Sequence, residues 1–251
     1  MRPRLQKERT YRRMMHSASL VAFRVVVRET DLLIQAPRDV SVPARESVVR
    51  HRGYIESYIA RHPAFATTLV PWRDPSPQPA ILRRMIAAGE AAGVGPMAAV
   101  AGALAEAVGT DLLTMVDAVI VENGGDVFFA VPQEVTAAIY AGDSPLSMHV
   151  GVRIAPGGGP LALCTSSGTI GHSLSLGKAD AVCVLSKDCA LADAAATAVG
   201  NTIGHAGDIR QALTAGRDIR GVAGIVAIVG PEMGACGEIT LVRIEGKRVA
   251  F

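Results

Sequence analysis

The run AVIVENGGDVFFAV at residues 118–131 decides the fold of this chain. Two runs of β-branched and aromatic residues, 118–121 and 127–131, flank a turn that contains paired glycines. Such runs favour strands, and glycine accepts the positive φ angles of a tight turn. The stretch therefore predicts an antiparallel hairpin within a sheet.

Further strands and helices are predicted on both sides of this hairpin. Apolar runs indicate a β-hairpin or one long bent strand at 23–34. They also indicate strands at 148–154, 161–164 and over about the last forty residues. Helical spacing of apolar residues predicts helices at 45–61, 80–92 and 191–200, and a further helix that begins at Gly95–Pro96. The class is α+β, in a single domain over residues 1–251. The proline-dense stretch 71–79 is interpreted as a surface connection within that domain.

Composition and charge narrow the classes of function. Hydrophobic residues make up 49% of the chain, and the formal charge of +2 gives no general argument for binding nucleic acid or an acidic membrane. The basic N-terminus is not followed by the apolar core of a signal peptide, and no apolar run approaches the roughly 20 residues of a membrane span. Cysteines at 164, 183, 189 and 236 lack zinc-ligand spacing. We expect a cytoplasmic protein with reduced core thiols and without a membrane span.

Two loops carry groups that suit a phosphorylated ligand. The turn residues Asn123, Gly124 and Gly125 let backbone N–H groups approach a ligand, although an ordinary hairpin turn needs the same residue types. A second loop, which follows the strand at 161–164, contains hydroxyls, glycines and one histidine: Ser166, Ser167, Gly168, Thr169 and His172. Hydroxyls and free amides suit phosphate oxygens.

Other catalytic motifs are absent or incomplete. The P-loop pattern fails because Ala179 stands where a Ser or Thr would bind magnesium, and the G-x-S-x-G elbow of serine hydrolases is missing. A thiol enzyme that uses Cys164 and His172 would need a geometry that the sequence does not show. It stays open as a minor interpretation.

Asp193 and Thr197 lie four residues apart in the predicted Ala-rich helix, and therefore on one face. A carboxylate and a hydroxyl in this arrangement can hold a cation that prefers oxygen ligands. The alternative is an aspartate that stabilises the start of the helix and a threonine that bonds to the backbone. The residues alone leave both interpretations open.

Taken in order, the turn at 123–126, the Ser-Gly loop at 166–169, His172 and the Ala-Asp-x-x-x-Thr helix at 192–197 resemble the motif series of the ApbE-like FAD:protein FMN transferases. The chain also resembles an uncharacterised family related to those enzymes, through segments that span most of its length: 8–12, 29–32, 94–102, 121–126 and 164–180. The resemblance implies an α+β fold of the FMN-transferase type, related to the T-fold, with a mostly antiparallel sheet layered with helices.

The resemblance also implies a chemistry and a set of site residues. FAD would lie across the glycine turn and the Ser-Gly loop, with Asn123, Gly124, Gly125, Ser166, Ser167, Gly168 and Thr169 as nucleotide contacts. Asp193 and Thr197 would hold a magnesium ion. His172 would act as the base while FMN passes to a threonine of an acceptor protein and AMP leaves.

The chain departs from the transferase pattern after the histidine. His172 is followed by Ser-Leu-Ser-Leu-Gly instead of a hydrophobic pair and Asp-Pro-x-x-Gly, and no Lys-Gly-Tyr segment precedes the glycine turn. Three functions stay open: a magnesium-dependent FMN transferase, a non-catalytic flavin or nucleotide carrier, and an enzyme that acts on another phosphorylated or carboxylated small molecule. The segments 29–31 and 94–102 have no assigned role. Apolar small-residue helices favour a homodimer.

Overall fold

The computed structural model describes residues 20–155, 159–168 and 177–244. Its largest feature is an eight-stranded sheet in which every neighbouring pair is antiparallel. The strands, in sheet order, are β1 (Val21–Val27), β2 (Thr30–Ala36), β3 (Val119–Asn123), β4 (Asp126–Ala130), β7 (Leu161–Ser166), β8 (Ala181–Ser186), β9 (Val222–Val229) and β10 (Glu232–Gly237).

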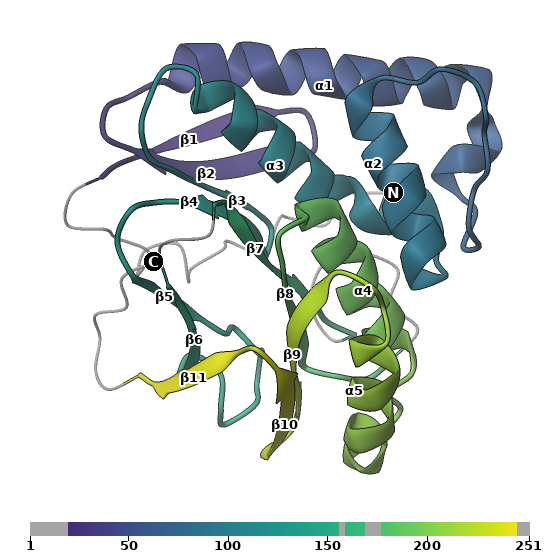
Figure 1. Cartoon of the computed structure of the whole chain (residues 1–251), viewed down its shortest axis with the longest axis vertical. Coiled ribbons are helices and arrows are strands. Elements are labelled where there is room, and N and C mark those ends of the chain that lie inside the picture. The colour runs from purple at the N-terminus through teal and green to yellow at the C-terminus, as the bar shows by residue number, and fades with distance from the viewer. Residues whose placement is uncertain (1–19, 156–158, 169–176, 245–251) are drawn as a thin grey trace, which may run out of the picture.

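A second antiparallel sheet and five α-helices complete the described fold (Figure 1). The second sheet has the order β11 (Thr240–Arg243), β6 (Val150–Ile154) and β5 (Val135–Ala138). The α-helices are α1 (Ser41–Arg61), α2 (Ala80–Ala92), α3 (Val100–Leu112), α4 (Cys189–Asn201) and α5 (Ile209–Arg217). Three short 3-10 helices are η2 (Pro63–Ala66), η3 (Pro96–Ala99) and η4 (Ala206–Asp208).

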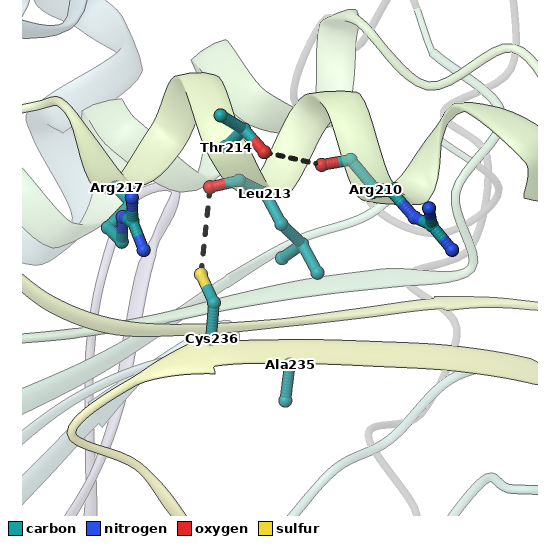
Figure 2. A pocket seen from close by; sticks show the side chains of 6 residues that line it. All are labelled: Arg210, Leu213, Thr214, Arg217, Ala235 and Cys236. Carbon is teal, nitrogen blue, oxygen red and sulfur yellow. Dashed lines mark hydrogen bonds between the residues drawn. The ribbon is translucent and has the colours of Figure 1, made fainter.

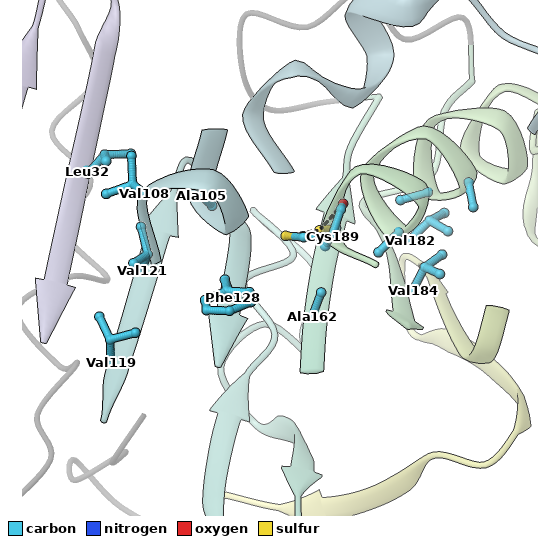
Figure 3. Packing of buried hydrophobic residues seen from close by; sticks show 14 of the residues in the cluster. Leu32, Ala105, Val108, Val119, Val121, Phe128, Ala162, Val182, Val184 and Cys189 are labelled. Carbon is cyan, nitrogen blue, oxygen red and sulfur yellow. Dashed lines mark hydrogen bonds between the residues drawn. The ribbon is translucent and has the colours of Figure 1, made fainter. Parts of the chain in front are cut away.

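The large sheet is buried on both faces. Alternate residues of its central strands point to different clusters: Val119 and Val121 pack under helices α1, α3, α4 and α5, whereas Ile120 packs against the small sheet. Figure 3 shows the helix side of this core, where Phe128 and Val182 lie among the same cluster. Because both faces are covered, the central strands are continuous apolar runs and not alternating ones.

A third apolar cluster forms an outer helical layer. Helix α2 packs there against α1, α3 and α4, and the buried aromatic residues Tyr58 and Phe65 belong to it. The Tyr58 hydroxyl donates to the Asp74 carboxylate (2.5 Å) and accepts from the Trp72 indole N–H (3.0 Å). These bonds hold the proline-dense stretch 71–79 against the helical layer.

The segment 29–31 has a structural role in this layer arrangement. The Asp31 carboxylate accepts from Arg24 (2.7 Å), which links β1 to β2. Arg52 of α1 donates to Thr30 (2.6 Å) and to Glu29 (2.6 Å). The segment therefore connects the first hairpin to helix α1, and this contact accounts for its polar residues Glu29, Thr30 and Asp31.

Most predicted elements are confirmed, with three omissions. The hairpins at 23–34 and 118–131 are present, and α2 has the predicted bounds, with Gly93 in the left-handed conformation at its C-terminus (φ 73°). Strands β5 and β8 and helix α5 were not predicted, and the prediction of β structure over about the last forty residues is wrong for the end of α5.

Among the described residues, no single helix is long and apolar enough to cross a membrane. One bent pair, Ala80–Ala92 with Pro96–Leu112, passes that test by length and composition only.

Candidate functional site

Four segments that are far apart in the sequence converge beside helix α4. The side-chain amide of Asn123, at the end of β3, donates to the carbonyl oxygen of Ala101 at the start of α3 (3.0 Å). The backbone N–H of Gly102 donates to Oδ2 of Asp193 on α4 (2.9 Å). These two bonds place the glycine turn, the N-terminus of α3 and the predicted cation ligand in one region of the molecule.

Glycine at position 102 is required by close contact between two helices. A Cβ atom there would lie 2.2 Å from the carbonyl oxygen of Cys189 and 2.9 Å from Cβ of Asp193. Only glycine lets the two backbones approach this closely. The structure therefore gives the segment 94–102 a role that its sequence did not reveal, because the segment brings α3 against the acidic residue of α4.

The position of α4 is fixed at its N-terminus by two carboxylates. Asp188 caps the helix by accepting from the N–H of Leu191 (2.8 Å). Glu106 of α3, which is 8% exposed, accepts from the N–H of Cys189 (3.1 Å) and pairs with Arg84 of α2. Negative groups at a helix N-terminus are stabilising, so these contacts fix the orientation of α4 in which Asp193 lies against the N-terminus of α3. Asp193 itself lies in the second turn and is not the N-terminal cap.

Two neighbouring aspartates give the site surplus negative charge. Burial raises the pKa of Asp193 to about 7, although the N–H groups of Gly102 and Ala101 oppose this increase. Burial, together with the nearby charge of Asp193, raises the pKa of Asp126 well above its ordinary value. Asp126 is 7% exposed, whereas Asp193 is partly exposed. Two such carboxylates favour a shared proton or a bound cation.

Asp126 has one oxygen without a partner. Its Oδ1 is buried and forms no hydrogen bond in the described part of the chain. An unsatisfied buried carboxylate oxygen is unfavourable unless another group compensates it. The oxygen-rich donors Asp126, Asp193 and Thr197 fit a hard cation such as magnesium. Within the described residues no three His, Cys, Asp or Glu side chains form a metal-binding group, so such an ion would need further oxygen ligands.

The glycine turn has the predicted conformation. Gly124 and Gly125 have positive φ angles of 73° and 118°. The carboxylate of Glu122 accepts from the N–H of Gly124 (2.8 Å). A Cβ atom at Gly125 would lie 3.4 Å from the carbonyl oxygen of Thr165, so the turn lies against the end of β7.

The described part of the Ser-Gly loop lies at the base of this region. Ser166 and Ser167 are half-buried and Gly168 is exposed. The N–H of Gly168 donates to the carbonyl oxygen of Ala179 (2.9 Å), which closes the base of the loop. A Cβ atom at Gly200, near the end of α4, would lie 3.8 Å from the Ser166 hydroxyl.

The structure thus places most of the predicted site residues on helix α4 or in the turn and loop beside it. Thr197 is half-buried, one turn beyond Asp193 on α4. Thr169 and His172 lie outside the described residues. Asp126 and Ala101–Gly102 were missed by the sequence interpretation. The signal for Asp126 was a charged residue at the start of an apolar strand, whereas Gly102 could be found only from the packing of α3 on α4.

The predicted burial of the cysteines is confirmed for three of the four. Cys164, Cys183 and Cys189 are buried, Cys236 is partly exposed, and none forms a disulfide. Sγ of Cys164 lies 3.6 Å from Sγ of Cys189, and burial raises the pKa of Cys164 well above its ordinary value. A thiol that remains protonated is a poor nucleophile, which disfavours the thiol-enzyme alternative.

Comparison with known proteins identifies related sequences over most of the chain. A family model described as "AbpE bacteria" matches residues 12–238. A "UPF0280 protein" from Methanocella arvoryzae is 40% identical over 215 residues, which cover 85% of this chain and 87% of the relative. A UPF0280 protein from Methanopyrus kandleri is 40% identical over 240 residues, which cover 92% and 96% of the two chains.

Solved structures of low sequence identity share the fold. The flavinyl transferase ApbE of Pseudomonas stutzeri, in its apo form, aligns with a TM-score of 0.53 and 14% identity, over 87% of this chain and 94% of that one. The flavin transferase ApbE of Vibrio cholerae aligns with a TM-score of 0.51 and 15% identity, over 88% and 97%. The predicted α+β fold, with its mostly antiparallel sheet, is confirmed by this likeness.

Proposed function

The chain belongs to the family described as "AbpE bacteria", and from that premise we propose that it binds a flavin nucleotide between the glycine turn, the Ser-Gly loop and helix α4. The observation that supports this most is the hydrogen bond from Gly102 N–H to Asp193 (2.9 Å), together with that from Asn123 to Ala101 (3.0 Å). These two bonds bring together the glycine turn, the N-terminus of α3 and helix α4, next to the carboxylates of Asp126 and Asp193.

The turn and the loop would hold the phosphates of the nucleotide. The hydroxyls of Ser166 and Ser167 would supply donors without positive charge, and Gly125 would let the nucleotide approach the backbone of the turn closely. The N–H groups of Gly124 and Gly168 already donate to Glu122 and Ala179. The turn that follows β3 and the loop that follows β7 lie next to each other, and the loop lies next to the end of α4. A pyrophosphate bound to such donors would bring further negative charge toward Asp193.

A cation resolves this accumulation of negative charge. Asp193 and Thr197 would hold magnesium, with the unpartnered Oδ1 of Asp126 close to the same charge. When bound, the ion would neutralise pyrophosphate charge and stabilise the departing AMP. Transfer of FMN from FAD to a threonine of an acceptor protein is the reaction that the resemblance to the FMN transferases implies, and we propose it for this site. His172 stays a predicted base, and the homodimer and the cytoplasmic location also stay predictions.

The test is an FAD fluorescence titration with and without magnesium, followed by chromatographic assay of released AMP. We expect binding that depends on magnesium in the wild type, and loss of that dependence in Asp193→Asn. Asp117→Asn makes the same charge change at an exposed position between α3 and β3, and should behave as the wild type.

Each outcome separates the three open functions. Magnesium-dependent binding with AMP release supports a transferase. Binding without release supports a carrier, for which the missing Asp-Pro segment after His172 is the specific argument. Absence of FAD binding in folded wild-type protein contradicts the proposal and means that the fold serves another ligand.

A further inference from the structure

A small cleft lies between helix α5 and strand β10, apart from the candidate nucleotide site. Its volume is about 160 Å³. Figure 2 shows the side chains around it, which are Arg210, Leu213, Thr214 and Arg217 from α5 with Ala235 and Cys236 from β10. The volume is well below the roughly 300 Å³ at which sites for drug-sized ligands begin, so the occupant would be smaller than a nucleotide.

Within the described residues, the two arginines of the cleft have no acidic partner. Arg210 and Arg217 are exposed, and neither forms an ion pair with a carboxylate of the described chain. Arg24 and Arg52, in contrast, both pair with acidic residues. Arg210 and Arg217 are seven positions apart, so they project from one face of α5 about 10.5 Å apart along its axis. Figure 2 shows them at opposite ends of the cleft.

The surface between the arginines is apolar. Leu213 is 7% exposed and points toward β10 between the two cations (Figure 2). The Thr214 hydroxyl donates to the carbonyl oxygen of Arg210 (3.0 Å), so its proton is directed to the helix itself. The Cys236 thiol similarly contacts the carbonyl oxygen of Leu213 (3.6 Å). The middle of the cleft therefore favours hydrocarbon over a polar group.

From this pattern we propose that the cleft binds a small organic dianion of the linear dicarboxylate class. Each guanidinium can bind one carboxylate in its planar fork, and the carbon chain between the carboxylates would cover Leu213. The Ala235 side chain points to the opposite face of β10 (Figure 2). A compact anion such as inorganic phosphate would reach one arginine and leave the apolar floor uncovered. This site does not depend on the flavin proposal, because it shares no residue with the region around Asp193.

Cys236 provides a direct measurement of occupancy. Among the four cysteines it alone is partly exposed, so N-ethylmaleimide should modify it in the native protein while the three buried thiols stay unmodified. Partial burial raises the pKa of Cys236, and nearby Arg217 opposes this increase. A ligand in the cleft would cover the thiol and slow its alkylation, which mass spectrometry follows at constant ionic strength.

The experiment compares adipate with butyrate and inorganic phosphate on the wild type and three variants. We expect saturable protection by adipate, at a concentration at least fivefold lower than any protection by butyrate or phosphate. Arg210→Gln and Arg217→Gln should each weaken adipate protection about fivefold, the value of an exposed ion pair near its upper limit. Arg220→Gln removes the same charge at an exposed position after α5 that does not line the cleft, and it should leave protection unchanged. Isothermal titration calorimetry of the same proteins checks the binding without the reagent.

Three results would overturn the proposal. Absence of saturable protection means that the cleft does not bind dicarboxylates. Equal protection by adipate and butyrate means that the two arginines do not act together. A loss in Arg220→Gln as large as that in Arg217→Gln means that only general surface charge attracts the anion. All three arginines are exposed, so circular dichroism should show that the variants keep the fold.

Discussion

Substitution of Asp193 by asparagine should stabilise the metal-free protein at alkaline pH. The amide keeps an oxygen that can accept the Gly102 N–H, so the contact between α3 and α4 remains. It removes a carboxylate whose ionised form is disfavoured by burial, and it removes the charge that raises the pKa of Asp126. The variant therefore separates the structural contact from the charge.

The magnitude follows from the pKa of Asp193, which rises from 3.8 to about 7 on folding. The native state holds this proton more tightly than the unfolded chain, so stability decreases as pH rises from about 4 to 7 and then stays level. At about 1.4 kcal/mol for each pKa unit, the carboxylate destabilises the fold by on the order of 1 kcal/mol at about pH 5 and by a few kcal/mol at about pH 8. Asparagine does not titrate and avoids this pH-dependent loss.

Thermal unfolding without divalent cations measures the difference. For a chain of this size 1 kcal/mol corresponds to about 2–4 °C, so the advantage of Asp193→Asn over the wild type should grow by about 5–10 °C between about pH 5 and pH 8. Magnesium should then raise the Tm of the wild type at about pH 8 and leave the variant unchanged. An advantage that does not change with pH, or a variant less stable than the wild type at about pH 8, would refute the reasoning that Asp193 is a destabilised carboxylate.

Two further substitutions test packing and hydrogen bonding. Gly102→Ala places Cβ 2.2 Å from the Cys189 carbonyl oxygen and should lower the free energy of unfolding by about 1–3 kcal/mol or more, measured by urea denaturation. Gly53→Ala, in α1 with nothing within 4 Å of the new atom, is its matched control and should stabilise by about 0.5–1 kcal/mol. Tyr58→Phe removes a hydroxyl that bonds to the half-buried Asp74 and Trp72 and should destabilise by about 0.5–1.5 kcal/mol, followed through Trp72, the single tryptophan. A loss below about 0.5 kcal/mol would mean that water replaces this hydroxyl.

The sequence predicted those elements whose information is local. Helix α2 was bounded correctly because Gly93 ends it in the left-handed conformation and a proline-rich stretch precedes it. The hairpin at 118–131 was predicted because its turn needs the positive φ angles that Gly124 and Gly125 adopt. Signals of this kind depend on residues within a few positions of one another, so they can be interpreted without knowledge of the tertiary structure.

The elements that were missed lack such signals or depend on distant partners. β8 (Ala181–Ser186) is a short apolar run buried on both faces, and a run of that length does not distinguish a strand from a buried helix. Helix α5 has strong amphipathic spacing but only nine residues, and its end lies in the stretch interpreted as β structure. Its place over β9 and β10 comes from packing, which sequence spacing alone does not reveal.

The candidate site could be predicted only in part, because the interaction between its two carboxylates depends on tertiary contacts and not on sequence motifs. Asp126 was read as part of a turn, and Asp193 as one ligand on a helix, 67 positions further along the chain. Only the approach of α3 to α4 at Gly102, and of the turn to β7, makes the two carboxylates neighbours whose ionisation is linked. A motif series could therefore indicate the kind of ligand, whereas the requirement for a compensating cation follows from the packing. If Asp193→Asn removes both the pH dependence of stability and the effect of magnesium, one contact between two helices accounts for both properties.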